Sequence, residues 1–296
     1  MSQIRVSILM TIYNAAPFLR ESIDSLLAQD YQDWELIAVE NGSTDQSAAI
    51  LAQYKDPRIK VFSLQKNIGR TPALRYAFDQ VQGEYTAVLD ADDIAAPERL
   101  SVQVSFLDQH KEVVLVGSWA LQIDEQSRVF DKWEPPAKAE DLYTCLAWIN
   151  PFVHSSCMFR HAAAVSAGGY PQEYIYAQDF ALILALAQKG KLGMIPEYLC
   201  RLRVFSRNMS NSFAHGKDVV REGLRLITYA GQHLTLDQKA MQMNRRSIAK
   251  YEIRSGIVEL RSRAYGRGIR RIVVALLRNP DILWINGFVR SRFYAV

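Results

Sequence analysis

Three carboxylates crowd a short stretch near the middle of the chain, at Asp90, Asp92 and Asp93. They directly follow residues 84–89, an apolar run that predicts a buried strand, and Pro97 is well placed to open a helix shortly afterwards. Carboxylates this close repel one another unless a cation or a hydrogen-bonded ligand compensates them. Mg²⁺ and Mn²⁺ favour oxygen ligands and bridge to diphosphates, so the cluster predicts a divalent-metal site, with a solvated acidic turn as the alternative.

Polar and aromatic residues also follow three other apolar runs. Thr11 and Tyr13 close the first run, and Glu40 and Asn41 close the second. Arg70 follows the third run, near an expected helix N-terminus, where an arginine can meet an anion. An aromatic ring can stack on a nucleotide base, and a carboxylate beside an amide has the hydrogen-bonding groups needed to recognise a base and a ribose. Each signal alone is weak, because the same residue types also serve in packing, in capped turns and as surface charge.

The elements that must position these residues alternate between strand and helix. We expect strands over residues 4–12, 34–39, 58–64 and 85–89, and helices over 18–27, about 46–54 and from 71. This order predicts an α/β fold with a mostly parallel sheet flanked by helices. Because parallel strands present their carboxyl ends at one edge, the polar clusters should converge on one crevice. A nucleotide diphosphate fits it, with the base at Tyr13 and Asn41, the ribose at Asp90, and the phosphates at the metal and Arg70.

Three helix starts carry recognisable caps. Asp45 is the expected cap of the second helix, and Thr71 followed by Pro72 is expected to open the third. Residues 235–238 have the form of a capping box led by Thr235, which predicts a long helix from that point.

The second half of the chain has a mixed pattern. It predicts helices to about residue 109 and over 141–148 and 179–188, and strands over 113–116, 152–159, 191–195 and 198–205. From residue 214 onward the pattern is helical, and we expect a boundary in the polar stretch near residues 206–216. The last helix expected, residues 268–278, places four apolar residues on one face: Ile269, Ile272, Val273 and Leu276.

Composition indicates a globular enzyme. With 296 residues the chain can form one large domain, or one domain with an appendage. Its three cysteines, Cys145, Cys157 and Cys200, lack metal-site spacing and indicate buried thiols in a reducing compartment. A strand begins almost at Met1 with no signal peptide, and no run of about 18 apolar residues occurs, so we expect a cytoplasmic protein without a transmembrane helix.

Charge is unevenly distributed along the chain. Residues 239–296 hold 13 basic and 3 acidic residues, whereas residues 1–238 hold 22 and 28. Arginines and bulky apolar residues alternate in the tail, which suits an anionic membrane face; a helical extension with solvated arginines is the alternative. No nucleic-acid motif accompanies the charge, so nucleic acid is not an expected partner.

Taken in order, the motifs resemble those of family 2 glycosyltransferases, which have the GT-A fold. The resembling stretches are residues 6–14, Glu40–Asp45, Asp90–Asp93 with Pro97–Leu100, Asn150–Ser156 and Gly168–Tyr170. The resemblance covers about residues 4–212 and implies a catalytic domain over 1–212, with a nucleotide-sugar half over about 1–110 and an acceptor half over about 111–212. A basic helical extension over 213–296 would follow.

The resemblance also implies ligands and roles. The donor would be a nucleotide-diphosphate sugar, usually a UDP-sugar, held with Mn²⁺ or Mg²⁺. The family's uracil contacts fall on Thr11, Tyr13 and the pair Glu40–Asn41, with Arg70 nearby. Asp92 would ligate the metal, and Asp90 or Asp93 would assist through the ribose or a water.

A carboxylate base is also implied. The family commonly carries it in a Glu-Asp pair after the Gly-Gly-Tyr segment, and this chain has Gln178–Asp179 there. Asp179 would take the proton from the acceptor hydroxyl as that oxygen attacks the anomeric carbon, which inverts its configuration. The alternative for Asp179 is a helix cap, and Gln178 departs from the family's glutamate.

Other departures concern histidines and aromatic residues. Relatives often carry a histidine where Phe205 stands, and phenylalanine cannot ligate a metal. His154 or His215 could replace it, although a lone histidine is more commonly structural. Acceptor sugars could stack on an aromatic ring, but core packing is the commoner role for each candidate: Trp133, Trp148 and Tyr176.

These features predict an inverting glycosyltransferase that builds a surface polysaccharide (lipopolysaccharide, capsule or O-antigen). Its acceptor would be a glycan or a lipid-linked glycan, and the basic tail would place it peripherally on the cytoplasmic face of the inner membrane. Two alternatives stay open: a catalytically silent partner subunit, and a nucleotidyltransferase on a related sheet. The latter expects a glycine-rich basic loop after the first strand, which residues 14–17 do not supply.

Overall fold

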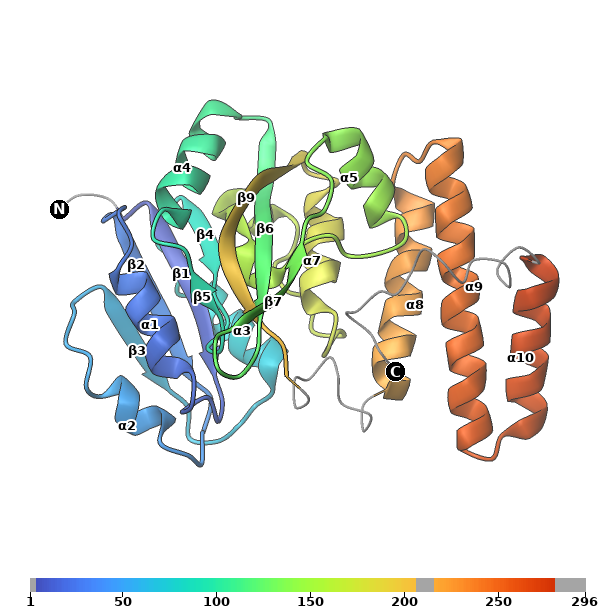
Figure 1. The fold of residues 1–296 in the computed structure, drawn as a ribbon, viewed down its shortest axis with the longest axis horizontal. Helices are drawn as coiled ribbons and strands as arrows, with labels where there is room; N and C mark the ends of the chain where they lie inside the picture. Colours follow the sequence, from blue (N-terminus) through green and yellow to red (C-terminus); the bar gives the residue numbers. More distant parts are fainter. Residues whose placement is uncertain (1–3, 206–215, 280–296) are drawn as a thin grey trace. The chain divides into compact units, whose positions relative to one another are not determined.

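The structure, a computed structural model, describes residues 4–205 and 216–279. The chain forms two compact units (Figure 1). The first comprises Met1–Leu142 with Phe152–Val204, and the second comprises Tyr143–Pro151 with Phe205–Val296. The domain boundary predicted near residues 206–216 lies almost wholly outside the described residues and stays a prediction.

One mixed sheet runs through the first unit. Its strands are β1 (Val6–Ile12), β2 (Trp34–Glu40), β3 (Ile59–Ser63), β4 (Tyr85–Val88), β5 (Ile94–Ala95), β6 (Val113–Ile123), β7 (Val129–Trp133), β8 (Met158–Arg160) and β9 (Lys191–Arg203). They pair in the order β3-β2-β1-β4-β8-β6-β9-β5, with β7 beside β6. The four strands from β3 to β4 are parallel, as predicted. The sheet becomes mixed where β8 joins β4 and β6 antiparallel.

Helices cover this sheet and make up most of the second unit. They are α1 (Leu19–Leu27), α2 (Ser47–Leu51), α3 (Arg70–Phe78), α4 (Arg99–Gln109), α5 (Ala139–Leu146), the 3₁₀-helix η1 (His154–Ser156), α6 (His161–Ser166), α7 (Gln178–Leu186), α8 (Gly216–His233), α9 (Gln238–Arg261) and α10 (Tyr265–Arg278).

The order of the parallel strands reverses at β1. The chain moves outward from β1 through β2 to β3 and then returns to β4 on the other side of β1. Right-handed crossovers therefore carry α3 to the face opposite α1. Consistently, α1 packs in one core cluster with alternate β1 residues such as Ile8 and Met10, and the buried residues of α3 do not belong to that cluster. The switch point between β1 and β4 is where an α/β sheet opens a crevice for ligands.

Several elements differ from the prediction because long-range pairing decides them. The strand predicted over residues 152–159 is mostly absent, since Val153 O accepts the N–H of Ser156 at 2.9 Å and closes η1 instead. The two strands predicted over 191–205 are one strand, β9, whose register shift beside Trp119 accommodates Pro196. The short strands β5 and β7 were not predicted; β5 exists only by pairing with residues 200–201 of β9.

Helix caps are also displaced from the predicted residues. Asp45 does accept the N–H of Ser47 at 2.9 Å, although Gln46 is the cap position of α2. The prediction for Thr71 is wrong, because α3 begins one residue earlier at Arg70 and the Thr71 hydroxyl donates to Tyr174 O. The capping-box prediction is wrong in detail, because Asp237 rather than Thr235 caps α9, accepting from Ala240 N at 2.6 Å.

In the second unit α8, α9 and α10 lie side by side (Figure 1). Asn244 of α9 joins two other segments by donating to Ile227 O at 2.8 Å and to Ala147 O at 2.7 Å. Gly231 makes room for that side chain, since a Cβ there would lie 2.4 Å from Asn244 Oδ1. None of the helices within residues 4–205 and 216–279 combines the length and the apolar character needed to span a bilayer.

Candidate active site

The carboxylates after β4 form a compact cluster at the switch point. One ligand oxygen from each of Asp90, Asp92 and Asp93 lies within 4.8 Å of the other two. A tight turn gathers them, because Asp93 N donates to Asp90 O at 3.1 Å. Ser22 of α1 donates to Asp90 O at 3.2 Å, and Asp90 N donates to Ser155 Oγ of η1 at 3.0 Å. The backbone of Asp90 is therefore held both by α1 and by η1.

Asp90 is paired with a cation of the chain. Arg70 Nη2 at the start of α3 lies 2.5 Å from Asp90 Oδ2, and His154 Nδ1 lies 3.8 Å from Asp90 Oδ1. Burial disfavours ionisation of Asp90, but the guanidinium of Arg70 outweighs burial and holds the pKa of Asp90 below its ordinary value. Asp90 is thus a stable carboxylate.

Asp92 and Asp93 are less well compensated. Burial and the neighbouring charge of Asp90 raise the pKa of Asp92 to about 6. Burial and the charges of Asp92 and Asp90 likewise raise the pKa of Asp93 well above its ordinary value. Asp93 Oδ1 accepts the N–H of Arg203 at 2.7 Å, while its buried Oδ2 has no hydrogen-bond partner among the described residues.

This donor set fits a divalent cation. Three carboxylates converge, two of them carry raised pKa values, and one buried oxygen lacks a partner among residues 4–205 and 216–279. Hard oxygen ligands of this kind suit Mg²⁺ or Mn²⁺. A cation at this position would compensate the repulsion that now raises the pKa of Asp92.

The ends of β1 and β2 form a second part of the site. Thr11 is half-buried near the end of β1, and Tyr13 just beyond it is 47% exposed. Asn14, in the left-handed region at φ 51°, accepts the N–H of Thr44 at 2.8 Å and so ties the two strand ends together. The buried carboxylate of Glu40 is used locally, because its Oε1 accepts the N–H of Ser43 at 2.6 Å.

Asn41 shapes the loop that presents Arg70. Its buried amide donates to Asn67 Oδ1 at 3.1 Å and to Gly69 O at 3.2 Å, and it accepts from Ile68 N at 3.0 Å. Gly69 has φ 93° and ψ 160°, a conformation that is essentially restricted to glycine. The amide predicted to contact a base is therefore committed to this loop.

Asp179 and Gln178 lie in the first turn of α7. Gln178 is buried, and in the orientation that satisfies both ends of its amide it accepts from Arg70 Nε at 3.2 Å and donates to Ile175 O at 2.9 Å. The negative charge of Asp179 acts on Arg70 together with the charges of Asp90 and Asp92. The structure thus brings the predicted base, the predicted metal ligands and Arg70 into one electrostatic group.

Two site residues were missed by sequence reasoning. His154 was expected to be structural, but its ring faces Asp90, and its Nε2 lies 2.9 Å from the hydroxyl of Tyr170. Arg203, whose side chain is fully buried, donates to Asp92 O at 2.8 Å and pairs with Glu21 at 2.6 Å. The stretch Asn150–Ser156, already noted for its resemblance, was the available signal for His154; nothing local marks Arg203.

The other candidates considered from the sequence are one histidine and three aromatic residues. His215 lies outside the described residues. Trp133 is half-buried against the small cluster that contains Ala120 and Val153. Tyr176 is half-buried in the loop before α7, and Trp148 belongs to the second unit.

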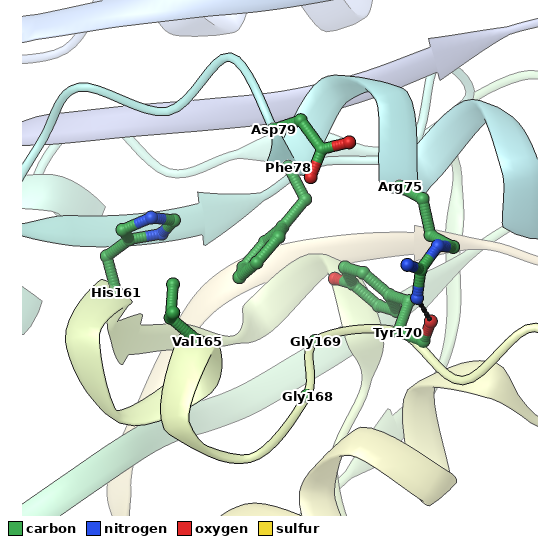
Figure 2. Close-up of a pocket in the computed structure, with 8 residues that line it drawn as sticks. All are labelled: Arg75, Phe78, Asp79, His161, Val165, Gly168, Gly169 and Tyr170. Carbon is green, nitrogen blue, oxygen red and sulfur yellow. Dashed lines mark hydrogen bonds between the residues drawn. The ribbon is translucent and has the colours of Figure 1, made fainter.

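A cavity of 370 Å³ lies elsewhere in the first unit, between the end of α3 and α6 (Figure 2). It is lined by Arg75, Phe78, Asp79, His161, Val165, Gly168, Gly169 and Tyr170. Figure 2 shows Arg75 donating to the backbone oxygen of Tyr170, at 2.6 Å. None of the predicted site residues lines this cavity, although the hydroxyl of Tyr170, which does line it, contacts His154 of the site.

A mixed α/β sheet that gathers carboxylates at its switch point is the architecture of GT-A glycosyltransferases. The model of the family described as glycosyl transferase family 2 matches residues 7–168, more than half of the chain. The chain belongs to this family and is a glycosyltransferase.

Relatives and solved structures agree with this assignment. The chain is 30% identical over 206 residues to the amylovoran biosynthesis glycosyltransferase AmsE of Erwinia amylovora, covering 68% of this chain and 76% of AmsE. It resembles S. aureus TarS 1–349 in complex with UDP-GlcNAc at a TM-score of 0.68 and 19% identity, covering 92% and 79% of the two chains. For mannosyltransferase PcManGT of Pyrobaculum calidifontis in complex with GDP-Man and Mn²⁺, the TM-score is 0.62 at 18% identity, covering 96% and 88%. At these identities the two structures show the shared fold.

Proposed function

We propose that this family 2 glycosyltransferase is an inverting, metal-dependent enzyme that uses a nucleotide-diphosphate sugar, specifically a UDP-sugar. The acceptor is a hydroxyl of a glycan or lipid-linked glycan in surface-polysaccharide assembly. The observation that carries the proposal is the convergence of Asp90, Asp92 and Asp93 within 4.8 Å at the switch point. The complexes of TarS with UDP-GlcNAc and of PcManGT with GDP-Man support the donor class, and AmsE supports the polysaccharide context.

The donor-binding roles follow the two parts of the site. The exposed ring of Tyr13 can stack on the base, and Thr11 can bond its edge. Glu40 and Asn41 contribute by fixing the strand-end turn and the 67–69 loop. Arg70, held by that loop, places its positive charge beside the carboxylates, where a diphosphate would lie.

The metal would be held by Asp92 and Asp90, with Asp93 as a third oxygen donor. The presence of Mn²⁺ in the PcManGT complex supports a divalent ion, and Mg²⁺ has the same oxygen preference. Bound there, such an ion would offset negative charge on the departing nucleoside diphosphate. Arg203 and Ser155 keep the carboxylates in place through their contacts with Asp93 and Asp90.

Asp179 would act as the base. Its carboxylate takes the proton of the acceptor hydroxyl while that oxygen bonds to the anomeric carbon and the bond to the diphosphate oxygen breaks. Attack occurs on the face opposite the leaving group and inverts the anomeric configuration. Gln178 supplies a neutral neighbour that holds Arg70, so only one carboxylate of the pair carries charge.

UDP release tests the base assignment. The substitution Asp179→Asn keeps the size and hydrogen-bonding shape of the side chain but removes its basicity. We expect turnover to fall by about 10²-fold or more while UDP binding is retained. Equal turnover in both proteins would discredit Asp179 as the base. Wild-type protein that binds UDP but transfers no sugar would favour the silent-partner alternative. Formation of a nucleotide sugar from a nucleoside triphosphate and a sugar phosphate, with release of pyrophosphate, would favour the nucleotidyltransferase.

The acceptor and the tail suggest where the enzyme works. We propose that the acceptor is presented at the cytoplasmic face of the inner membrane and that the basic C-terminal part meets its anionic surface. Residues 239–296 contain 13 basic and only 3 acidic residues, and this positive charge supports an anionic membrane surface as the partner.

A further inference from the structure

Helix α10 presents a continuous apolar stripe to solvent. Four large side chains follow one another at every fourth position with exposures of 60%, 55%, 46% and 77%: Tyr265, Ile269, Val273 and Leu277. Residues four apart lie on the same side of an α-helix, so these side chains form one band along α10. Single exposed apolar residues are ordinary, but an aligned row of four is not.

Close packing against α9 fixes which side of α10 faces outward. A Cβ on Gly256 of α9 would lie 2.8 Å from Gly268 O and 2.6 Å from Ile272, so the two helices touch through their glycines. Gly268 and Ala275 are buried on the inner side of α10. Turning the stripe inward would move larger side chains into this close contact, so the outward stripe is a consequence of the packing.

The polar side of α10 carries arginines and no acidic residue. Arg271 pairs with Glu252 at 3.1 Å and with Glu259 at 3.4 Å on α9. The other three arginines of the helix form no ion pair with any described residue: Arg267, Arg270 and Arg278. By helical spacing Arg270 borders the stripe, and Arg267 and Arg278 lie further around the helix.

We infer that α10 lies in the interface of an anionic bilayer, with the stripe among the acyl chains and the arginines at the headgroup phosphates. This inference rests on the membrane association proposed above and names the surface that makes it. An amphipathic helix with bulky apolar residues on one side and arginines on the other has the form of an interfacial helix. Tyr265 suits the boundary because its ring is apolar and its hydroxyl is polar.

Charge favours a bilayer over a second copy of the chain. Two α10 stripes packed face to face would bring their bordering arginines together, and like charges at close range oppose association. Anionic lipid headgroups supply the complementary charge instead. Lipid also covers a narrow row of side chains on one helix without requiring a matching protein surface.

Vesicle flotation of the full chain tests this assignment. Vesicles of phosphatidylcholine with phosphatidylglycerol are compared with phosphatidylcholine alone, at low and high salt. The double variant Ile269→Ser with Val273→Ser removes apolar area without changing charge, and we expect its affinity for anionic vesicles to fall about tenfold, with loss of the salt-resistant part of binding. Arg267→Gln with Arg270→Gln should weaken binding chiefly at low salt.

A matched control exists on β7, where Val129 and Phe130 are 50% and 55% exposed. Val129→Ser with Phe130→Ser removes comparable apolar exposure and should leave vesicle binding unchanged. Unchanged binding of the α10 serine pair, or wild-type protein that ignores every vesicle, overturns the inference. Light scattering then tests whether a second copy of the chain covers the stripe instead. If the wild type is a dimer and the variant Ile269→Ser with Val273→Ser is a monomer, the stripe is a self-association surface. UDP binding in the presence of Mn²⁺ is measured in the same proteins without vesicles. If it is retained while vesicle binding fails, the membrane inference is wrong but the proposed glycosyltransferase function is not.

Discussion

Arg70 Nη2 lies 2.5 Å from Asp90 Oδ2, so the first carboxylate after β4 is paired with a cation of the protein itself. The same guanidinium meets Gln178 through Nε at 3.2 Å. Arg70 therefore links the strand end that carries the acidic cluster to the helix start that carries Asp179. Gln178 bonds Arg70 without adding a competing charge, which leaves the guanidinium to Asp90.

Removing the charge of Arg70 should tighten metal binding and weaken nucleotide binding. In Arg70→Gln the carboxylates lose a nearby positive charge, so we expect Mn²⁺ affinity to rise about tenfold and UDP affinity to fall. Titration calorimetry with each ligand measures both changes. Arg20→Gln serves as a control, because Arg20 is exposed on α1 and bonds Gln53. Weaker Mn²⁺ binding in Arg70→Gln would contradict this role for the pair.

Two glycines with similar positive φ angles allow the effect of backbone strain to be separated from an effect on donor binding. Gly69 has φ 93° and Gly168 has φ 90°, and a Cβ at Gly168 would meet nothing within 4 Å while one at Gly69 would only reach Pro72 at 3.6 Å. Each alanine variant should cost about 1–3 kcal/mol of stability through backbone strain. Only Gly69→Ala should also weaken UDP binding, because Gly69 presents Arg70. Equal UDP affinities in the two variants would show that the 67–69 loop does not position the donor site.

The buried Arg203 should matter more for stability than its exposed partner. Its side chain is fully buried and bonds Asp92 O and Asp124 O, whereas the side chain of Glu21 is 45% exposed. Arg203→Met should lower the free energy of unfolding by about 3 kcal/mol, since the carbonyl groups of Asp92 and Asp124 lose the buried guanidinium that donates to them. Glu21→Gln should cost less than about 1 kcal/mol. Urea unfolding of both variants measures the difference, and a larger loss in Glu21→Gln would reverse this ranking.

Acid stability should depend on Asp108. Its bond to Arg5, at 2.9 Å, is the main cause that lowers the pKa of Asp108, and the hydroxyl of Tyr85 adds a bond at 2.8 Å. A lowered folded-state pKa stabilises the fold above the unfolded value of about 4, and this contribution disappears as pH falls through the folded value. Asp108→Asn should therefore unfold more easily than wild type at pH 7, modestly because both partners are about one-third exposed. The gap in stability between the two proteins should narrow steadily as pH falls below about 4. Thermal unfolding across this range checks the prediction; a gap that persists in acid would assign the effect to packing instead.

The first half of the fold was predictable because its strands are parallel and three of them, β1, β2 and β4, are buried on both faces. Such strands appear in sequence as continuous apolar runs, and polar residues at their ends must share one sheet edge. The grouping of Asp90 and Asp92 with Arg70 followed from that logic. The second half was harder, because β5 depends on pairing between residues 94–95 and 200–201, which no local pattern encodes.

The roles of single side chains were the least predictable part of the site. His154 approaches Asp90 only because η1 replaces the first part of an expected strand. Asn41 has the residue type suited to a base, yet its amide holds the neighbouring loop. On α10, Ile269 and Val273 share the predicted apolar face with Ile272 and Leu276, but they are exposed because the glycine contact with α9 sets the rotation of the helix.

The central claim is that the acidic cluster holds a divalent cation that in turn holds the diphosphate of the donor. Calorimetric titration of UDP with and without Mn²⁺, in wild type and in Asp92→Asn, tests it most directly. We predict that Mn²⁺ tightens UDP binding to wild type about tenfold or more and that Asp92→Asn abolishes this gain. UDP affinity that does not depend on Mn²⁺ in wild type, or that keeps its full dependence in Asp92→Asn, would contradict the assignment.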